Sequence, residues 1–105
     1  MENKHYFYVL ECRDNSYYAG YTNDIEKRVQ THNDKKGAKY TKTRTPVQLI
    51  HCETFETKSE ALKKEYAFKQ LTRKHKEAYI KERQSDKWLN NKKASNTKKQ
   101  RVFYT

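Results

Sequence analysis

A chain of 105 residues has room for one domain with a single modest core. The charged fraction of 35% exceeds the hydrophobic fraction of 33%, and the formal net charge is +11. Such a field attracts polyanions, nucleic acid above all, but it identifies no reaction. The sequence has no apolar run long enough for a membrane span and no secretory signal at its N-terminus, so we expect a soluble, cytoplasmic protein with no membrane partner.

Two segments rich in aromatic and β-branched residues, 6–12 and 16–21, predict an antiparallel hairpin, because the residues between them favour a tight turn. Strand alternation puts Tyr8 on one face of the first strand, and Tyr18 and Gly20 on one face of the second. We therefore expect two phenol groups to meet beside a glycine. The alternative is that these tyrosines only satisfy amphipathic strands.

A first helix is predicted from Asn23 to His32. Asn23 followed three residues later by Glu26 has the form of a capping box. Arg28 and His32 are four residues apart, so they share one flank of this helix at the border of its buried side. His32 could also act only on the helix dipole at the C-terminal end.

Residues 34–46 are basic, end at a proline and are predicted to form a loop. Residues 47–55 are expected to form a third strand in the middle of the sheet, because their alternate positions are largely apolar on both faces. Both cysteines, Cys12 and Cys52, lie in strand-like segments without the paired spacing of a zinc site, so we expect two reduced thiols in the core.

The basic segment suits either a solvated surface or a phosphate backbone. Residues in it, and one on the helix before it, are the candidates for contact with nucleic acid: Lys27, Lys35, Lys36, Lys39, Tyr40, Lys42 and Arg44.

Two further helices are predicted, one beginning at the capping box of Thr57 and Glu60 and one capped by Thr72. Helical spacing puts Glu65 within the apolar stripe of the second helix, so its carboxylate should face inward. A structural ion pair with Arg28 is one interpretation of that carboxylate.

The C-terminal residues 84–105 contain six basic residues and one acidic residue, with too little apolar surface to order the segment, and we expect a disordered basic tail. The folded domain is then residues 1–83. The predicted class is α+β, a three-stranded antiparallel sheet flanked by about three helices.

The inward or boundary polar groups could be assembled into a phosphodiester hydrolase, and the ones that we select are Tyr8, Tyr18, Arg28, His32 and Glu65. Phosphoryl chemistry needs a nucleophilic water, a positive group on the non-bridging oxygens and help for the leaving oxygen. A magnesium ion can be held by only one or two carboxylates, with water and phosphate completing its shell. Glu65, the one inward carboxylate that the pattern offers, is the expected metal ligand.

The order and spacing of these residues resemble the GIY-YIG nuclease superfamily. The first motif of the family falls on residues 6–8 (YFY) and the second on residues 18–20 (YAG), while Arg28, His32 and Glu65 match its arginine, its histidine or tyrosine, and its metal-binding glutamate. The runs GAKYTKTR, PVQLI and SEALKKE are similar to a small single-domain bacterial branch whose members mostly lack an assigned function. The resemblance spans about residues 5–83. It departs from the family pattern at Tyr6, at Ala19 and in lacking the downstream asparagine.

The resemblance implies a metal-dependent endonuclease that hydrolyses phosphodiester bonds in DNA, with structured DNA in repair or recombination as the expected setting. It implies that Tyr8 or Tyr18 acts as base or orients the water, that Arg28 holds the phosphate, and that His32 donates or accepts a proton. Glu65 would bind one Mg²⁺ or Mn²⁺ ion. No small-molecule cofactor is expected, and a monomer is one option for the assembly. The alternative function is a nucleic-acid-binding domain that keeps the fold without the chemistry.

Overall fold

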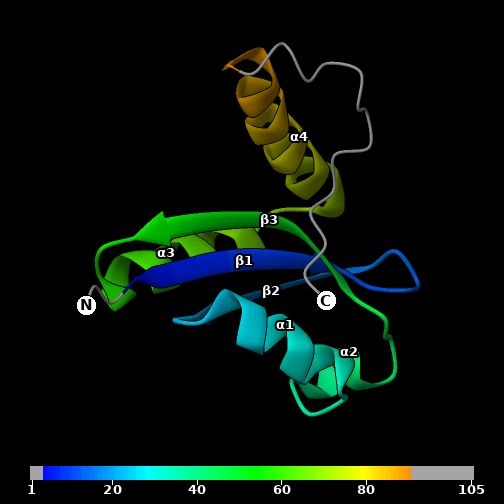
Figure 1. Cartoon of the computed structure of the whole chain (residues 1–105). Helices are drawn as coiled ribbons and strands as arrows, with labels where there is room; N and C mark the ends of the chain where they lie inside the picture. Colours follow the sequence, from blue (N-terminus) through cyan, green and yellow to red (C-terminus); the bar gives the residue numbers. More distant parts are fainter. Residues whose placement is uncertain (1–3, 91–105) are drawn as a thin grey trace.

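The structure of the chain, a computed structural model, describes the backbone of residues 4–90 and the side chains of residues 4–83 (Figure 1). It confirms the α+β class with a three-stranded antiparallel sheet. The elements are β1 (His5–Glu11), β2 (Tyr17–Thr22), α1 (Ile25–Asn33), α2 (Lys39–Lys42), β3 (Gln48–Phe55), α3 (Lys58–Lys69) and α4 (Arg73–Asn90). Within residues 4–90, the helices are all too short or too polar to cross a membrane.

The strand order is β2-β1-β3, so β1 is the central strand. The expectation that the third strand lies in the middle of the sheet is wrong. Four consecutive residues of β1, from Phe7 to Leu10, are buried, whereas Cys52 and Thr54 in the second half of β3 are exposed. The buried residues of β3, Leu49 and Ile50, lie in its first half, and Phe55 at its end is only partly buried.

A β-bulge separates the two halves of β3. Val9 of β1 lies opposite His51, and Leu10 lies opposite Leu49, so Ile50 is the extra residue of the bulge. Ile50 packs in the same apolar cluster as Phe7, and the ring of His51 also contacts Phe7. The bulge therefore turns two successive side chains of β3 toward one face.

The hairpin of β1 and β2 forms as predicted. Its turn closes through a hydrogen bond from the Asn15 amide to the Cys12 carbonyl (2.9 Å), and Asn15 adopts a left-handed φ of 69°. The register places Tyr8 opposite Gly20 and Leu10 opposite Tyr18, so these four residues share one face of the sheet.

Helices cover both faces of the sheet (Figure 1). One face, here called the α1–α2 face, packs β-strand residues such as Tyr8, Leu10 and Leu49 against Val29 of α1. The opposite face, the α3–α4 face, has a second apolar cluster. That cluster contains Phe7, Val9, Ala19, Ile50, Phe68 and Ile80. The chain thus builds two thin cores on one sheet.

The helix starts follow local capping, with one correction. Thr57 caps α3 as predicted, accepting a hydrogen bond from the Glu60 amide (3.1 Å), and Thr72 accepts one from the His75 amide (3.2 Å) at the start of α4. The cap of α1 is Asp24 rather than Asn23, because the Thr22 hydroxyl accepts a hydrogen bond from the Asp24 amide and holds that residue extended.

The basic segment after α1 is more ordered than a plain loop. Lys35 adopts a left-handed φ of 65°, and its amide and that of Lys36 bond to the carbonyls of His32 and Thr31, which is a Schellman ending for α1. The short helix α2 follows, which the proline and basic residues did not suggest.

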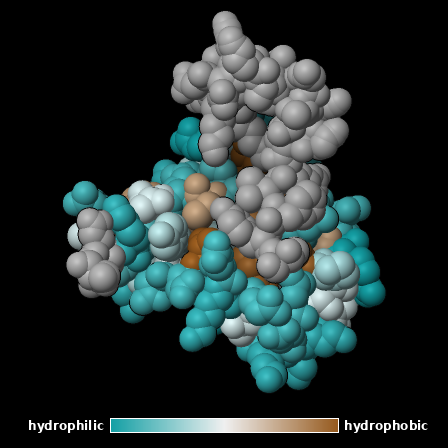
Figure 2. Space-filling model, in the orientation of Figure 1, coloured by the Kyte–Doolittle hydropathy of each residue, from teal (hydrophilic) through white to brown (hydrophobic). Residues whose placement is uncertain are grey.

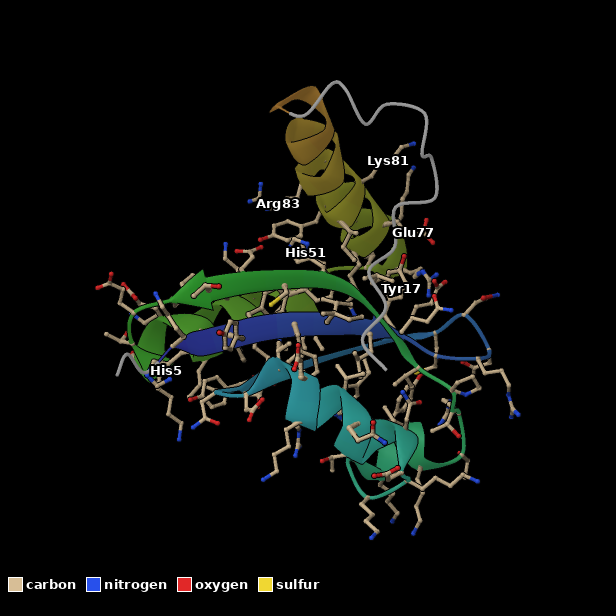
Figure 3. The ribbon with its side chains drawn as sticks, viewed as in Figure 1. His5, Tyr17, His51, Glu77, Lys81 and Arg83 are labelled. Atoms are coloured by element: carbon tan, nitrogen blue, oxygen red, sulfur yellow. The ribbon has the colours of Figure 1, made fainter. Side chains whose placement is uncertain are left out.

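The start of α4 is fixed to the hairpin turn through Arg73. Its guanidinium donates to the Asn15 carbonyl (2.8 Å) and to Glu77 (2.7 Å), and it lies 3.8 Å from the ring centre of Tyr17. Figure 3 shows Tyr17 and Glu77 at this junction. From there α4 points away from the sheet (Figure 1).

The predicted domain end at residue 83 falls inside α4, whose backbone continues to Asn90. The remaining residues of the predicted tail, 91–105, lie outside the described residues. Neither cysteine forms a disulfide, and Cys12 is buried as expected, but Cys52 is exposed. The placement of Cys52 in the core is therefore wrong, because it lies on the exposed half of an edge strand.

Candidate active site

The candidate site is built around the hydroxyl group of Tyr8. This residue is 1% exposed, and its hydroxyl lies 3.0 Å from Nε2 of His32, which is fully buried in the last turn of α1. Arg28 of the same helix donates from Nε to the Tyr8 oxygen over a longer distance, 3.4 Å. The predicted flank of α1 therefore meets the predicted face of the hairpin, and it does so at one phenol.

A second hydrogen bond holds the other nitrogen of His32. Nδ1 lies 2.8 Å from the hydroxyl of Thr41, a fully buried residue of α2. The Thr41 hydroxyl in turn lies 3.1 Å from the carbonyl oxygen of Ala38. Three buried side chains from β1, α1 and α2 are thus joined in one chain of hydrogen bonds.

Both titratable members of this chain are shifted toward their neutral forms. Burial raises the pKa of Tyr8 to about 12, with a smaller contribution from the negative charge of Glu65, and the hydrogen bond from Arg28 opposes the shift. Burial and the positive charge of Arg28 lower the pKa of His32 from 6.5 to about 4. At neutral pH the site therefore holds a phenol and an uncharged imidazole.

Each of the two glycines of the chain lies against one member of the Tyr8–His32 pair. A Cβ atom on Gly20 would lie 2.5 Å from the Tyr8 hydroxyl, and one on Gly37 would lie 2.4 Å from Nδ1 of His32. Any larger residue at either position would push a buried ring from its place. The glycines are needed for close approach here.

Tyr18 forms the open side of the site. Its ring centre is 5.2 Å from that of His32, and it stacks on Tyr40 at 6.1 Å with an angle of 22° between the rings. The guanidinium of Arg44 lies 3.9 Å from the centre of the Tyr40 ring. Arg44 also pairs with Asp14 at 3.0 Å, so this candidate contact for nucleic acid already has a protein partner.

A hollow of about 250 Å³ runs along the edge strand β2 beside Tyr18. Its lining includes Tyr18, Tyr40, Lys69 and Lys76. Aromatic rings and ammonium groups from β2, α2, α3 and α4 therefore meet next to the Tyr8–His32 pair.

Glu65 lies in α3 with its side chain 17% exposed, which agrees with the predicted inward position. Its carboxylate pairs with Lys69 of the same helix at 2.8 Å. The structural ion pair with Arg28 is not formed among the described residues. Because the charge of Glu65 contributes to the pKa of Tyr8, and Lys69 lines the hollow beside Tyr18, the carboxylate belongs to the same region.

The metal that the resemblance implies has a plausible donor in this region. Among residues 4–83, no group of three or more histidine, cysteine, aspartate or glutamate side chains could hold an ion together. Magnesium needs only one or two carboxylates when water and substrate phosphate supply its other ligands. The single carboxylate of Glu65 fits that kind of site if Lys69 moves aside.

The remaining candidate contacts for nucleic acid lie on the same side of the sheet. Lys27 is exposed on α1, and Tyr40 is 39% exposed next to Tyr18. The other lysines, all exposed on α2 or in the segment before it, are Lys35, Lys36, Lys39 and Lys42. Most of the described surface in this view is hydrophilic (Figure 2).

Thr41 and Gly37 belong to the site but were not selected from the sequence. Thr41 follows His32 by nine residues and lies in a short helix that no periodicity announces. The signal that could have found Gly37 is composition, since a chain with only two glycines has one in the second motif and one here.

A second polar cluster lies on the α3–α4 face. Glu53 of β3 accepts hydrogen bonds from His51 (2.7 Å) and Tyr79, and Arg83 lies 3.5 Å from the same oxygen. Figure 3 shows His51 and Arg83 at the junction of β3 with α4. Burial alone would raise the pKa of Glu53, but the hydrogen bonds from His51 and Tyr79 outweigh it and lower the pKa. No role was predicted for His51, and it acts here as a partner of Glu53.

The comparisons with known proteins identify the family and the fold. The family profile of the GIY-YIG catalytic domain matches residues 4–80. The UPF0213 protein YazA of Bacillus subtilis is 65% identical over 85 residues, which are 81% of this chain and 86% of that protein.

Solution structures of two relatives share the fold. The UPF0213 protein BH0048 of Bacillus halodurans is 45% identical with a TM-score of 0.51, covering 74% of this chain and 83% of that one. The protein EF2693 of E. faecalis is 58% identical with a TM-score of 0.53, covering 77% and 88%.

Proposed function

This chain belongs to the GIY-YIG family, and on that premise we propose that it is a metal-dependent endonuclease that hydrolyses phosphodiester bonds in DNA. The observation that carries the proposal is the buried hydrogen bond between Tyr8 and His32, with Arg28 at the same phenol. A phenol can donate one hydrogen bond and accept another, and here the group that can only donate to it is a cation, Arg28.

Arg28 is the proposed contact for the scissile phosphate. Its side chain is half-buried at the border of α1, so the guanidinium can meet a phosphate while it still contacts Tyr8. A planar guanidinium matches two phosphate oxygens and stays charged at any working pH. Tyr18, which lines the hollow, is the phenol that can reach the substrate directly.

Tyr8 and His32 form the proposed path for the proton of the attacking water. With a pKa of about 12, Tyr8 enters the reaction as a neutral phenol. As Tyr8 takes a proton from the water, it gives its own to Nε2 of His32, so no free phenolate is required. The negative charge of a bound phosphate would raise the pKa of His32 from about 4 and make it a better acceptor.

Glu65 is the proposed ligand of the metal ion. A bound Mg²⁺ or Mn²⁺ would supply positive charge to the phosphate and to the leaving oxygen. Binding of the ion would require the ion pair between the Glu65 carboxylate and the Lys69 ammonium group to separate.

The ion pair between Glu65 and Lys69 is also the observation that favours the alternative function. If Lys69 holds the carboxylate permanently, no metal binds there. The basic side chains around α2 would then serve a nucleic-acid-binding domain that lacks catalysis.

The test is a cleavage assay with the full chain on labelled duplex, nicked, forked and single-stranded DNA and on RNA, with Mg²⁺, Mn²⁺ or a chelator. We expect metal-dependent cleavage of at least one DNA, and a loss of about 100-fold or more in the Glu65→Gln variant. Glu60→Gln is the matched control, since Glu60 is an exposed residue of the same helix. Equal cleavage by wild type and Glu65→Gln would exclude the proposed ligand, and binding without cleavage of any substrate would support the alternative.

A further inference from the structure

The hydroxyl of Thr41 lies within hydrogen-bond distance of two acceptor atoms but has one proton to donate. Its oxygen is 3.1 Å from the carbonyl oxygen of Ala38 and 2.8 Å from Nδ1 of His32. A carbonyl oxygen can only accept a hydrogen bond, whereas a neutral imidazole nitrogen can donate or accept. If Thr41 donates to Ala38, then Nδ1 of His32 must carry the hydrogen of that imidazole.

The other end of the chain of hydrogen bonds leads to the same arrangement. Arg28 can only donate to the Tyr8 oxygen, so the Tyr8 proton must go elsewhere. Nε2 of His32, 3.0 Å away, accepts it if the imidazole hydrogen is on Nδ1. With the hydrogen on Nε2 instead, the Tyr8 oxygen would face two donors, and its own proton would have no acceptor that the structure shows among the described residues.

We propose that Thr41 is a positioning residue that fixes His32 in the Nδ1–H tautomer, so that Nε2 is held ready to accept the proton of Tyr8. The order of donation is Arg28 to Tyr8, Tyr8 to His32, His32 to Thr41, and Thr41 to the Ala38 carbonyl. The catalytic importance of this order rests on the proposed function. The tautomer itself does not.

The surroundings make the position of Thr41 unusually well defined. Thr41, His32 and Tyr8 are all 0–1% exposed, so bulk water cannot replace the missing partner if one is removed. Gly37 lets the chain before α2 pass close to the His32 ring, and the Schellman ending at Lys35 sets the direction of that chain. The tautomer is therefore selected by the backbone path between α1 and α2.

In the proton transfer, the O–H bond of Tyr8 breaks and an N–H bond forms at Nε2 of His32, while Tyr8 gains a proton from the water. His32 becomes an imidazolium with Nδ1–H still donating to Thr41. As the products form, the proton on Nε2 returns to Tyr8, and Tyr8 gives its other proton to the leaving oxygen of the substrate. Thr41 keeps its own hydroxyl proton throughout, so it takes no part in the transfer.

The tautomer can be measured directly by long-range ¹H–¹⁵N correlation NMR of the imidazole nitrogens in the free protein at neutral pH. We expect His32 to show a protonated Nδ1 and an unprotonated Nε2, with the exposed His75 as an internal reference. A protonated Nε2 in the wild type would overturn the proposal, whether or not the protein is a nuclease.

Three variants test whether Thr41 is the cause. Thr41→Val keeps the shape but removes the acceptor of the Nδ1 hydrogen, and we expect part of the His32 population to move its hydrogen to Nε2, because only the Tyr8 end then favours Nδ1–H. Thr41→Ser keeps the hydroxyl and should retain the wild-type tautomer. Thr43→Val, an exposed neighbour with the same substitution, is the control and should also retain it. An unchanged tautomer in Thr41→Val would overturn the proposal, and Thr41→Ala is measured by the same criterion if the valine variant does not fold.

Cleavage provides the second measurement. Thr41→Val should lower kcat by about 10-fold to 100-fold with little change in KM, whereas Thr41→Ser should have a kcat near that of the wild type. A shifted tautomer with unchanged kcat would leave Thr41 as the positioning residue but reject the proton path through His32. If the wild type does not cleave, the tautomer measurement still decides the position of the hydrogen.

Discussion

On the α3–α4 face of the sheet, a tyrosine, a histidine and an arginine gather around one carboxylate. Tyr79, His51 and Arg83 all lie at Glu53, and although burial raises its pKa, the hydrogen bonds from His51 and Tyr79 hold that pKa below the usual value. All three partners lie at the same carboxylate oxygen, Oε2. This cluster joins β3 to α4.

On the α1–α2 face, the same residue types meet without a carboxylate, because Glu65 belongs to α3, which packs on the opposite face. Tyr8, His32 and Arg28 meet at a hydroxyl, and Glu65 is paired with a lysine of its own helix. Here the tyrosine and the histidine are both held neutral. The contrast teaches that composition does not separate a structural cluster from a reactive one. The difference is that Arg83 lies at a carboxylate, whereas Arg28 lies at a neutral phenol.

The largest expected effect comes from changing one carboxylate at a time. Glu65→Gln should abolish metal-dependent cleavage yet change the free energy of unfolding by less than about 1 kcal/mol, since its partner Lys69 is half exposed. Glu53→Gln should lower the free energy of unfolding by about 1–3 kcal/mol because a charged, hydrogen-bonded group is lost. Its cleavage rate per folded molecule should be unchanged. Urea denaturation and cleavage assays of both variants check this, and equal behaviour of the two would refute the contrast.

The second effect concerns pH. The folded pKa of His32, about 4, is below the ordinary 6.5, so the unfolded chain binds the proton more readily. The contribution of His32 to the free energy of unfolding is therefore fully present above pH 6.5. It is lost as the pH drops from 6.5 toward 4, which lowers the free energy of unfolding by roughly 3 kcal/mol.

Glu53 acts in a lower window, because a depressed carboxyl pKa removes stability only as the pH falls below its ordinary value and through the folded one. In His32→Gln, the free energy of unfolding should fall less between pH 6.5 and pH 4.5 but should still fall below pH 4.5. In Glu53→Gln, the fall above pH 4.5 should remain and the fall below it should be smaller. Urea titrations at a series of pH values measure both, and a His32→Gln curve parallel to the wild type would show that another group is responsible.

The third effect is steric and belongs to the α1–α2 face alone. Gly20→Ala and Gly37→Ala should each lower the free energy of unfolding by about 2–3 kcal/mol, because the new methyl group overlaps a buried ring. Ala38→Gly, next to Gly37, is a control for local backbone effects. Thermal melts provide the measurement. Unchanged melting temperatures in both alanine variants would mean that the Tyr8–His32 pair is more loosely packed than the structure indicates.

The smallest expected effect concerns the basic surface. Replacing Lys39 and Lys42 together by glutamine should weaken DNA binding and reduce the slope of log affinity against log salt by about 2 if both contact phosphates. The matched double variant changes Lys58 and Lys63, two exposed lysines of α3. It should leave the slope nearly unchanged. An equal loss of DNA affinity in the two double variants would show that DNA does not bind preferentially to the α1–α2 face.

Local patterns were sufficient for much of the fold. The hairpin, the helix starts at Thr57 and Thr72, and the meeting of Tyr8 with Gly20 follow from strand alternation and capping, which act within a few residues. The inward position of Glu65 follows from helical spacing in the same way.

The missed features depend on contacts between distant segments. The bulge at Ile50 and the central position of β1 are set by which strands pair, and strand order leaves no mark in local periodicity. Thr41 becomes a site residue only because α2 folds back onto His32. Lys69 rather than Arg28 is the partner of Glu65, since it is one helical turn away and always within reach.

The contacts of Arg73 have a mechanical consequence. One guanidinium joins the tip of the hairpin to the first turn of α4, so the length and shape of the β1–β2 turn contribute to the direction of that helix, together with the contacts of Tyr79 and Arg83 at Glu53. An insertion beside Asn15 would therefore re-aim α4 without altering a residue of the helix. For anyone fusing a partner protein to the C-terminal side, the place to adjust the relative angle is a turn some sixty positions upstream, and not the joint itself.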